Sequence, residues 1–391
     1  MKIQGEVILK KGREASARRF HPWIFSGAIH SVEGNPQDGD WVEVKDDSKQ
    51  TLGFGHYQKG TITVRLFSFS TNPPNERLYT DKLTKALHQR IVTKVKNDLT
   101  NCYRLVHGEG DGLPGLIIDL YNGVAVMQAH HLGIHRDRQL IADALKEVFS
   151  EDVHSIYYKN MGTPHGKNES EYLLGMTGVP HVVMEHGQKF YVDWEEGQKT
   201  GFFLDQRENR KLVGEISKGS KVLNTFSYTG GFSVYALTAG AELVHSVDAS
   251  EKAIELTKKN ILLNGFDPIQ HQSFVADTFD YLKDKKDEYD LIILDPPAFA
   301  KHKDARHQAM KGYQRLNAEA MRVIKHGGII FTFSCSQVVD RQLFYDTVVS
   351  SAIQSGREIK VLHHLSQPAD HPVSMYHPEG EYLKGLVLYV S

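Results

Sequence analysis

The chain has 391 residues, of which 40% are apolar and 24% charged, and its formal net charge is −2. This length allows two or three domains with cores of their own, and no apolar run approaches the roughly 18 residues of a membrane helix. Two distant cysteines, Cys102 and Cys335, exclude a disulfide scaffold and a thiolate zinc cluster. The N-terminus lacks an apolar signal core, so we expect a cytoplasmic protein with no membrane partner.

Residues 1–72 are the first predicted domain. The stretches "WVEVKD" and "TITVRLFSF" alternate in polarity and are separated by Gly and Asp turns. Such a pattern is typical of a small β domain. A basic cluster lies in residues 10–21 and, taken alone, has the composition of a solvated surface. Its basic residues include Lys11, Arg13, Arg18 and Arg19.

Residues 73–180 are the second predicted domain, which begins at the paired prolines of "STNPPNE". A helical stretch, "ERLYTDKLTKALHQRIVTKV", precedes strand-like sequence and a second helix near 136–149. This mixture predicts a small α+β domain. Cys102 is interpreted as a core residue. The turn "GEGDGLPG" is distinctive, but the sequence suggests no chemical role for it.

Residues 181–391 are the third predicted domain. After a hairpin-like stretch beginning "VVMEHGQKFYV", helices alternate with continuously apolar strands. This alternation predicts a doubly wound parallel sheet. Such sheets bind ligands at the carboxyl ends of their strands, near the point where the strand order reverses.

The first strand of this sheet ends in "NTFSYTGGF" (224–232). Gly230 and Gly231 allow a tight turn beside a ligand, and Asp248 ends the second strand, where a carboxylate can accept hydrogen bonds from ribose hydroxyls. The fingerprint G-x-G-x-x-G is absent, which favours S-adenosylmethionine over NAD. The structural alternative is a plain strand–helix turn, with Asp248 as a helix N-cap.

Two further strands end in acidic residues. Asp277 and Phe279 follow the third strand. There, Asp277 would hydrogen-bond an adenine and Phe279 would stack on it. The structural alternative is that Asp277 only caps a helix. The fourth strand ends in "LDPPAFAK", in which two prolines stiffen the backbone around Asp295 and remove two N–H donors. A rigid acceptor of this kind fits a base with an amino group, and a structural turn is the alternative.

The fifth strand, "GGIIFTFS", runs into Cys335. If the fourth strand lies between the first and the fifth, the thiol is close to Asp295 and to the glycine turn, because neighbouring strands are about 5 Å apart. A base over Asp295 would then have the methyl donor at one edge and the thiol at the other. Cytosine C5 methylation requires this arrangement, since thiolate addition at C6 makes C5 nucleophilic. Taken alone, Cys335 would also serve as apolar filler.

The segment "QKTGFFLDQRENR" (198–210) precedes the first strand. Gln206, Arg207 and Arg210 would clamp a carboxylate or phosphate, or merely begin an amphipathic helix. Among the 21 histidines, His371 and His377 lie in loop-like sequence, and no metalloprotease motif is present. We therefore expect no metal site.

Seven stretches, in this order, resemble landmarks of the bacterial class I methyltransferases that make 5-methylcytosine in large-subunit rRNA. They are "RRFHPWIFSGAI", "GEGDGLPGLIIDLY", "GFFLDQRENR", "FSYTGGFSVYAL", "DPPAFAK", "FSCSQ" and "EYLKGLVLYV". The resemblance covers almost the whole chain. It implies an α/β protein with an N-terminal β-barrel PUA domain (1–72), a central α+β domain (73–180) and a Rossmann-like methyltransferase domain (181–391).

The resemblance also implies roles for individual residues. Cys335 would be the nucleophile and Asp295 would contact the target base and the cofactor. Asp248 would bind the ribose and Asp277 the adenine of S-adenosylmethionine. The other cofactor-binding residues would be Gln206, Arg207, Phe226, Tyr228, Thr229, Gly230 and Phe279. Gln337 stands where this family often has histidine, which leaves a proton-transfer role at that position open.

The sequence therefore predicts methylation of cytosine C5 in 23S rRNA, dependent on S-adenosylmethionine. The resemblance implies that the basic cluster contacts this RNA and that the chain forms a homodimer. Two alternatives stay open. One is methylation of a base amino group, because Phe299 follows the Asp-Pro-Pro loop closely. The other is an rRNA-binding assembly factor without catalytic activity.

Overall fold

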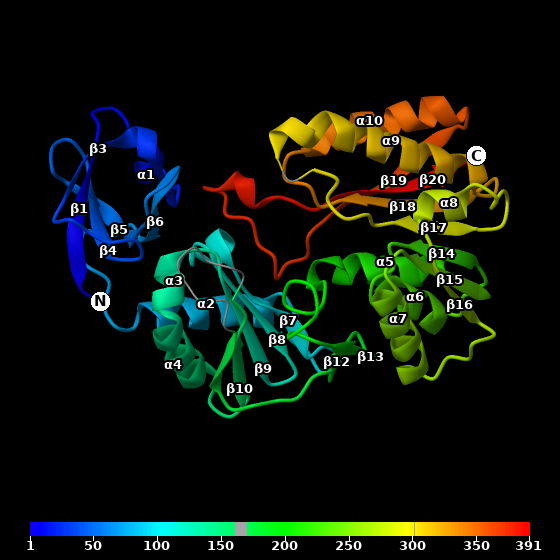
Figure 1. Cartoon of the computed structure of the whole chain (residues 1–391), viewed down its shortest axis with the longest axis horizontal. Helices are drawn as coiled ribbons and strands as arrows, with labels where there is room; N and C mark the ends of the chain where they lie inside the picture. The colour runs from blue at the N-terminus through cyan, green and yellow to red at the C-terminus, as the bar shows by residue number, and fades with distance from the viewer. Residues whose placement is uncertain (161–169, 301) are drawn as a thin grey trace. The chain divides into compact units, whose positions relative to one another are not determined.

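The computed structural model describes residues 1–160, 170–300 and 302–391 (Figure 1). Lys301, which ends the motif "DPPAFAK", lies outside these residues. None of the described helices is both long and apolar enough to cross a membrane. The chain divides into two compact units and passes between them several times. The first contains Met1–His181, Val192–Phe202 and Ala369–Gly380, and the second contains Val182–Tyr191, Phe203–Pro368 and Glu381–Ser391.

The N-terminal part of the first unit forms a sheet of six described strands, in the order β2-β6-β5-β4-β1-β3. The strands are β1 (Ile3–Leu9), β2 (Trp23–Phe25), β3 (Ile29–Glu33), β4 (Trp41–Lys45), β5 (Thr51–Tyr57) and β6 (Ile62–Ser68), with α1 (Ala15–Arg18) between β1 and β2. Val7, Leu9, Val42 and Val44 are buried in one apolar cluster. The strands predicted from "WVEVKD" and "TITVRLFSF" are confirmed as β4 and β6.

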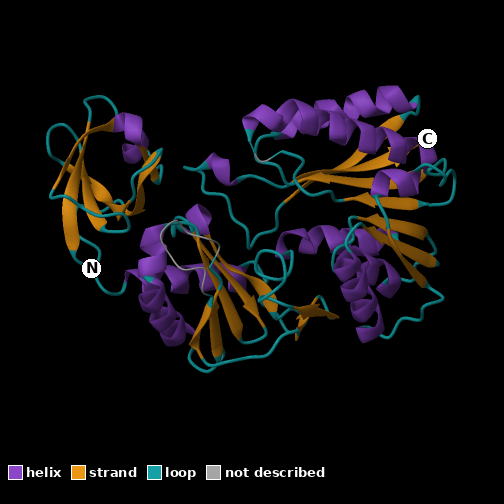
Figure 2. Ribbon diagram, viewed as in Figure 1, coloured by secondary structure: helices purple, strands orange, loops and turns teal. Residues whose placement is uncertain are grey.

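The rest of the first unit combines a five-stranded sheet, in the order β11-β10-β9-β8-β7 for the described residues, with helices beside it (Figure 2). The strands are β7 (Cys102–His107), β8 (Leu116–Tyr121), β9 (Val124–Ala129), β10 (Ser155–Tyr158) and β11 (Glu171–Leu174); the helices are α2 (Leu78–Val92), α3 (Leu132–Arg136) and α4 (Arg138–Phe149). Apolar side chains of both layers share one core. Cys102 is fully buried, as its interpretation as core requires.

The turn "GEGDGLPG" has a structural role in the first unit. Its 3₁₀ segment η2 (Gly108–Asp111) carries Asp111, whose carboxylate accepts hydrogen bonds from both terminal nitrogens of Arg90 at 2.5 and 2.8 Å. The backbone N–H of His107 donates to the same carboxylate at 2.6 Å. Arg90 is fully buried on α2, so this ion pair joins the helix to the end of β7.

The second unit contains the predicted doubly wound sheet. Its described strands follow the order β16-β15-β14-β17-β18-β20-β19. The strands are β14 (Lys221–Thr225), β15 (Leu243–Asp248), β16 (His271–Val275), β17 (Leu291–Leu294), β18 (Gly328–Ser334), β19 (Ile359–Ser366) and β20 (Lys384–Val390). A separate hairpin pairs β12 (His181–Glu185) with β13 (Gln188–Val192). The parallel prediction is confirmed for β14 to β18, whereas β20 runs antiparallel to both of its neighbours.

Helices cover both faces of this sheet (Figure 1). They are α5 (Arg207–Ile216), α6 (Gly231–Thr238), α7 (Glu251–Leu263), α8 (Thr278–Leu282), α9 (Arg306–Val323) and α10 (Arg341–Ser355). One apolar core joins α8, α9 and α10 to strands of the sheet. Since β14 has β15 on one side and β17 on the other, the strand order reverses at the end of β14, where a ligand is expected.

Candidate active site

Strand register brings three of the predicted site residues to one edge of the sheet. Thr225, the last residue of β14, pairs with the neighbouring strands β15 and β17. The residues that follow these pairs are Phe226, Asp248 and Asp295, and they lie at the same level along the strand direction. Neighbouring strands are about 4.8 Å apart. The sequence-based expectation that the first and fifth strands flank the fourth is confirmed.

The turn after β14 has an uncommon backbone. Phe226, Tyr228 and Gly230 have φ values of +54°, +46° and +74°. Left-handed conformations are unfavourable for residues with a Cβ, and they gather at functional sites where the surrounding structure holds them in place. Gly230 is also the N-cap of helix α6. Two residues that the sequence analysis assigned to this turn, Phe226 and Tyr228, are therefore constrained in a way that the sequence did not predict.

Helix α7 holds this turn in place. Thr257 Oγ1 donates to the carbonyl oxygen of Tyr228 at 2.9 Å, and Asn260 Nδ2 donates to that of Thr229 at 2.8 Å. A Cβ on Gly230 would lie 2.7 Å from Cγ2 of Thr257. Glycine is therefore required at this position for two reasons, the left-handed backbone and the close approach of α7.

Asp248 is fixed by backbone donors on both oxygens. Its Oδ2 accepts from the N–H of Tyr228 and its Oδ1 from the N–H of Ser250, each at 2.9 Å. The N-cap of α7 is Ser250, so the alternative that Asp248 caps this helix is wrong. A carboxylate has about four acceptor positions, and these two bonds leave capacity for the two hydroxyls of a ribose. The site therefore fits a nucleoside cofactor.

Asp277 and Phe279 have local contacts of their own. Asp277 caps α8 by accepting from the N–H groups of Phe279 and Asp280 through Oδ1, at 2.8 and 3.2 Å. The capping alternative is thus confirmed for this residue, although its side chain is exposed and its second oxygen is not used in the cap. The Arg315 guanidinium lies 4.8 Å from the centre of the Phe279 ring, so a cation occupies one face of that ring.

Gln206 and Arg207 are buried at the start of α5. Gln206 Oε1 accepts from Asn209 Nδ2 at 2.6 Å, which ties this side chain to the first turn of the helix. Three residues earlier, the ring of Phe203 meets the ring of Tyr228 edge to face, with 5.1 Å between centroids. The segment before α5 therefore lies beside the glycine turn.

Cys335 follows β18 and is half-buried. The serines on both sides of it are buried and bonded to other elements. Ser334 Oγ donates to Tyr313 Oη at 3.0 Å, and Ser336 Oγ donates to the carbonyl oxygen of Ala300 at 2.7 Å. These two anchors fix the backbone on each side of the thiol without enclosing the thiol itself, which argues against a role as buried filler.

The Asp-Pro-Pro loop is attached to the same segment. Ala300, the acceptor for Ser336, belongs to this loop, and the ring of Phe299 packs against Tyr313 with 4.6 Å between centroids. The parallel register of β17 and β18 puts Asp295 level with Phe333, two residues before Cys335. The thiol therefore lies beyond the carboxylate along the strand direction.

Lys384 is a site residue that the sequence analysis did not identify. It begins β20, is buried, and donates to the carbonyl oxygens of Ser336 at 2.6 Å and Tyr382 at 2.8 Å. Burial lowers the pKa of Lys384 to about 8, and the charge of Cys335 acts in the opposite direction. The sequence feature that could have identified Lys384 is its position as a lysine within the otherwise apolar run "LKGLVLYV". Its ammonium group is a cation beside the candidate nucleophile.

The predicted RNA contacts lie in the first unit. Lys11, Arg13, Arg18 and Arg19 are all exposed around helix α1. Arg18 also pairs with the buried carboxylate of Asp46 at 2.5 Å. One arginine of the basic cluster, Arg18, is therefore held in place by an ion pair within the first unit.

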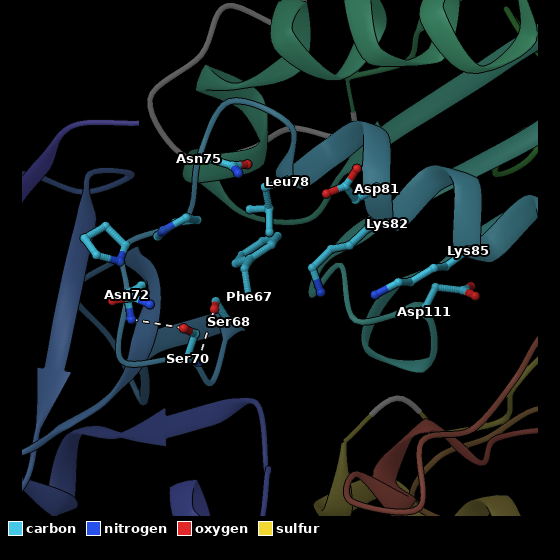
Figure 3. Close-up of a pocket in the computed structure, with 12 residues that line it drawn as sticks. Phe67, Ser68, Ser70, Asn72, Asn75, Leu78, Asp81, Lys82, Lys85 and Asp111 are labelled. Atoms are coloured by element: carbon cyan, nitrogen blue, oxygen red, sulfur yellow. Dashed lines mark hydrogen bonds between the residues drawn. The ribbon is translucent and has the colours of Figure 1, made fainter.

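A cavity of about 360 Å³ also lies in the first unit, between the 70–76 connection and α2 (Figure 3). Phe67 and Leu78 line it together with Lys82, Lys85 and Asp111. Burial, followed by the neighbouring charge of Lys85, lowers the pKa of Lys82 to about 8. None of the predicted site residues lines this cavity, so it is separate from the candidate active site.

Comparison with known proteins agrees with this geometry. Residues 138–379 match a family model described as S-adenosylmethionine-dependent methyltransferase, and residues 7–69 match a PUA-like domain. A protein from Alteromonas mediterranea is 38% identical over 100% of both chains, and one from Aeromonas salmonicida is 39% identical over 98% of both. Both carry the name ribosomal RNA large subunit methyltransferase I.

Solved structures agree as well. A methyltransferase crystallised with SAH covers 100% of both chains at 25% identity, with a TM-score of 0.86. A second structure, assigned as a SAM-dependent methyltransferase from Streptococcus mutans, also covers 100% of both at 25% identity, with a TM-score of 0.84. The cofactor is thus S-adenosylmethionine, as predicted. The chain belongs to the family of S-adenosylmethionine-dependent methyltransferases that includes the ribosomal RNA large subunit methyltransferases I.

Proposed function

We propose that this protein methylates C5 of a cytosine in 23S rRNA, with Cys335 as the nucleophile. The observation that carries the proposal is the position of Cys335, half-buried between two anchored serines and next to the Asp-Pro-Pro loop. The names of the relatives support the RNA substrate. Because the substrate is rRNA, we also infer a cytoplasmic location.

The proposed chemistry begins at the thiolate. Cys335 Sγ forms a bond to C6 of the cytosine, and the C5–C6 electron pair becomes available at C5. S-adenosylmethionine, when bound, would supply the methyl group that C5 takes up, and S-adenosylhomocysteine would be its leaving group. Loss of the C5 proton to water then re-forms the C5–C6 double bond, the C6–S bond breaks, and the thiolate returns. Lys384 stabilises the thiolate electrostatically, since a nearby cation favours ionised sulfur.

We propose that the constrained turn Phe226–Gly230 and Asp248 hold the cofactor. Thr229 and Tyr228 contribute backbone groups within that turn, and Asp248 accepts from the ribose hydroxyls. Asp277 and Phe279 contact the adenine, and Gln206 and Arg207 lie beside the cofactor. Asp295, stiffened by the two prolines, orients the exocyclic amino group of the cytosine.

RNA binding is assigned to the PUA-like domain. Lys11, Arg13, Arg18 and Arg19 contact phosphates, which position RNA without reading its sequence. The target cytosine must leave its helix to reach a thiol at a strand end. The three domain boundaries, 1–72, 73–180 and 181–391, and the homodimer stay predictions.

A mechanism-based trap tests the proposal. Large-subunit RNA that carries 5-fluorocytosine is incubated with the protein and S-adenosylmethionine. Fluorine at C5 cannot leave as a proton does, so the enzyme stays bound through the C6–S bond. We expect a covalent complex that survives denaturing electrophoresis, disappears in Cys335→Ser and persists in the matched control Cys102→Ala.

The outcomes separate the alternatives. An adduct that survives Cys335→Ser would refute the assigned nucleophile. Full methylation by Cys335→Ala would select transfer to a base amino group, which needs no thiol. Absence of S-adenosylmethionine binding in calorimetry would favour an rRNA-binding assembly factor. Bisulfite mapping of rRNA from a deletion strain would then identify the modified cytosine.

A further inference from the structure

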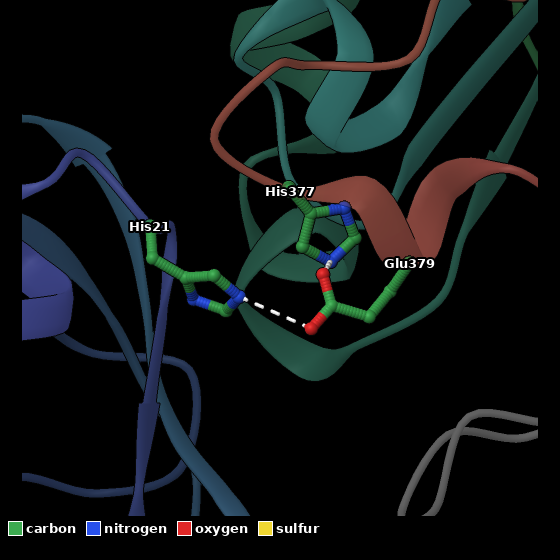
Figure 4. Close-up of side chains that lie close together, drawn as sticks. All are labelled: His21, His377 and Glu379. Atoms are coloured by element: carbon green, nitrogen blue, oxygen red, sulfur yellow. Dashed lines mark ion pairs between the residues drawn. The ribbon is translucent and has the colours of Figure 1, made fainter.

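Three potential metal ligands converge in the first unit from two segments that are distant along the chain. His21 lies just before β2, and His377 and Glu379 belong to or adjoin the 3₁₀ segment η5 (Pro378–Gly380). The Glu379 carboxylate lies between the two imidazoles (Figure 4). Its Oε1 is 3.5 Å from His21 Nε2 and its Oε2 is 3.8 Å from His377 Nε2. One potential ligand atom from each residue lies within 4.8 Å of the other two.

His377 provides an independent reason to expect a ligand here. Its side chain is 4% exposed, yet neither Nδ1 nor Nε2 has a hydrogen-bond partner among the described residues. Buried polar groups are almost always satisfied by protein, water or an ion. Trp23 packs on this imidazole with 4.3 Å between ring centroids, and its Nε1 is held by Glu109 at 2.8 Å. The ring is therefore fixed with its Nε2 directed at the cluster.

His21 can present the correct nitrogen. With a proton on Nε2, its Nδ1 accepts a hydrogen bond from the backbone N–H of Trp23 at 3.2 Å. With the proton on Nδ1 instead, Nδ1–H donates to the carbonyl oxygen of Trp23 at 3.4 Å, and the Nε2 lone pair faces Glu379. Metal-bound histidines usually donate their other ring N–H in this way, which fixes the orientation of the ring.

We propose that His21, His377 and Glu379 bind a zinc ion. Two imidazoles and a carboxylate form a common zinc ligand set, with a fourth position open for water. Ligands about 2.1 Å from a tetrahedral ion are about 3.4 Å apart, so the observed cluster needs only a small contraction. The ion would fasten residues 369–380 to the segment before β2. The sequence analysis expected no metal site because no ligand motif is present, and His21 and His377 are distant along the chain.

Metal titration of the full-length protein tests the proposal. Chelator-treated protein is titrated with cobalt(II), whose tetrahedral complexes absorb visible light, and with zinc against a chromophoric chelator. We expect one tight site per chain. His377→Gln and His21→Gln should abolish it, and Glu379→Gln should weaken zinc binding at least tenfold. The double variant His363→Gln/His364→Gln, which alters two exposed histidines on β19 in the second unit, should retain it.

Thermal unfolding provides a second measurement. Zinc should raise the melting temperature of the unaltered protein but not that of Glu379→Gln, because an ion that binds only the folded state stabilises it. The Glu379 side chain is half-exposed, so this variant should fold even if His377→Gln does not. Absence of a saturable site, or a site that Glu379→Gln and His21→Gln leave unchanged, would overturn the proposal and identify the cluster as a histidine–glutamate ion pair.

Discussion

The turn after β14 predicts a specific cost for replacing Gly230 by alanine. Its φ of +74° disfavours any residue with a Cβ by about 1–2 kcal/mol. The new Cβ would also lie 2.7 Å from Thr257 Cγ2, and overpacking of this kind costs about 1–3 kcal/mol. Gly230→Ala should therefore lower the free energy of unfolding by roughly 2–5 kcal/mol.

Two matched variants separate these contributions. Gly265→Ala, with a φ of +78° and no atom within 4 Å of the added Cβ, carries only the backbone cost. Thr257→Ser removes Cγ2 but retains the Oγ1 that bonds to Tyr228. The double variant Gly230→Ala/Thr257→Ser removes the 2.7 Å contact and leaves two contacts of 3.2 Å, so it should recover most of the steric part of the loss and keep the backbone part.

Urea denaturation and S-adenosylmethionine calorimetry provide the measurements. If the turn of Gly230→Ala relaxes in the absence of the cofactor, cofactor binding must restore the original geometry. The free energy of that change then raises the Kd for S-adenosylmethionine, tenfold for about every 1.4 kcal/mol. We expect Gly230→Ala to lose stability, affinity or both, and Gly265→Ala to bind the cofactor normally. Unaltered stability and affinity in Gly230→Ala would refute the reasoning, as would a double variant no better than Gly230→Ala.

Two further predictions rest on shifted pKa values. Burial lowers the pKa of His271 to about 4, while its Nε2 lies 2.8 Å from Ser246 Oγ. As the pH falls, the unfolded chain therefore binds a proton at His271 at a higher pH than the folded chain does. This difference should lower the free energy of unfolding by up to about 3 kcal/mol between pH 6.5 and pH 4. The urea midpoint of His271→Gln should depend less steeply on pH across that range than the midpoint of the unaltered protein. Lys384→Met should slow alkylation of Cys335 by iodoacetamide several-fold at pH 7 in a Cys102→Ala background. The difference in alkylation rate between the protein with Lys384 and the Lys384→Met variant should narrow above pH 8, where Lys384 loses its proton. Equal alkylation rates of the two proteins at pH 7 would exclude Lys384 from a role at the thiol.

The sequence alone determined the parts of the fold that follow from periodicity and turn chemistry. Alternating polarity in "WVEVKD" predicted β4, and alternating apolar strands and helices predicted the parallel order from β14 to β18. Glycine, proline and acidic residues at strand ends identified Gly230, Asp248 and Asp295. These signals are local, because strand and helix periods and turn preferences act over a few residues.

The tertiary structure decided which residues meet. Strand register placed Asp248 and Asp295 beside the turn, and it showed that Ser250 rather than Asp248 caps α7. Lys384 reached Ser336 only because β20 pairs with β18 in antiparallel orientation. Such contacts join residues distant along the chain, and their geometry depends on packing that no local pattern encodes.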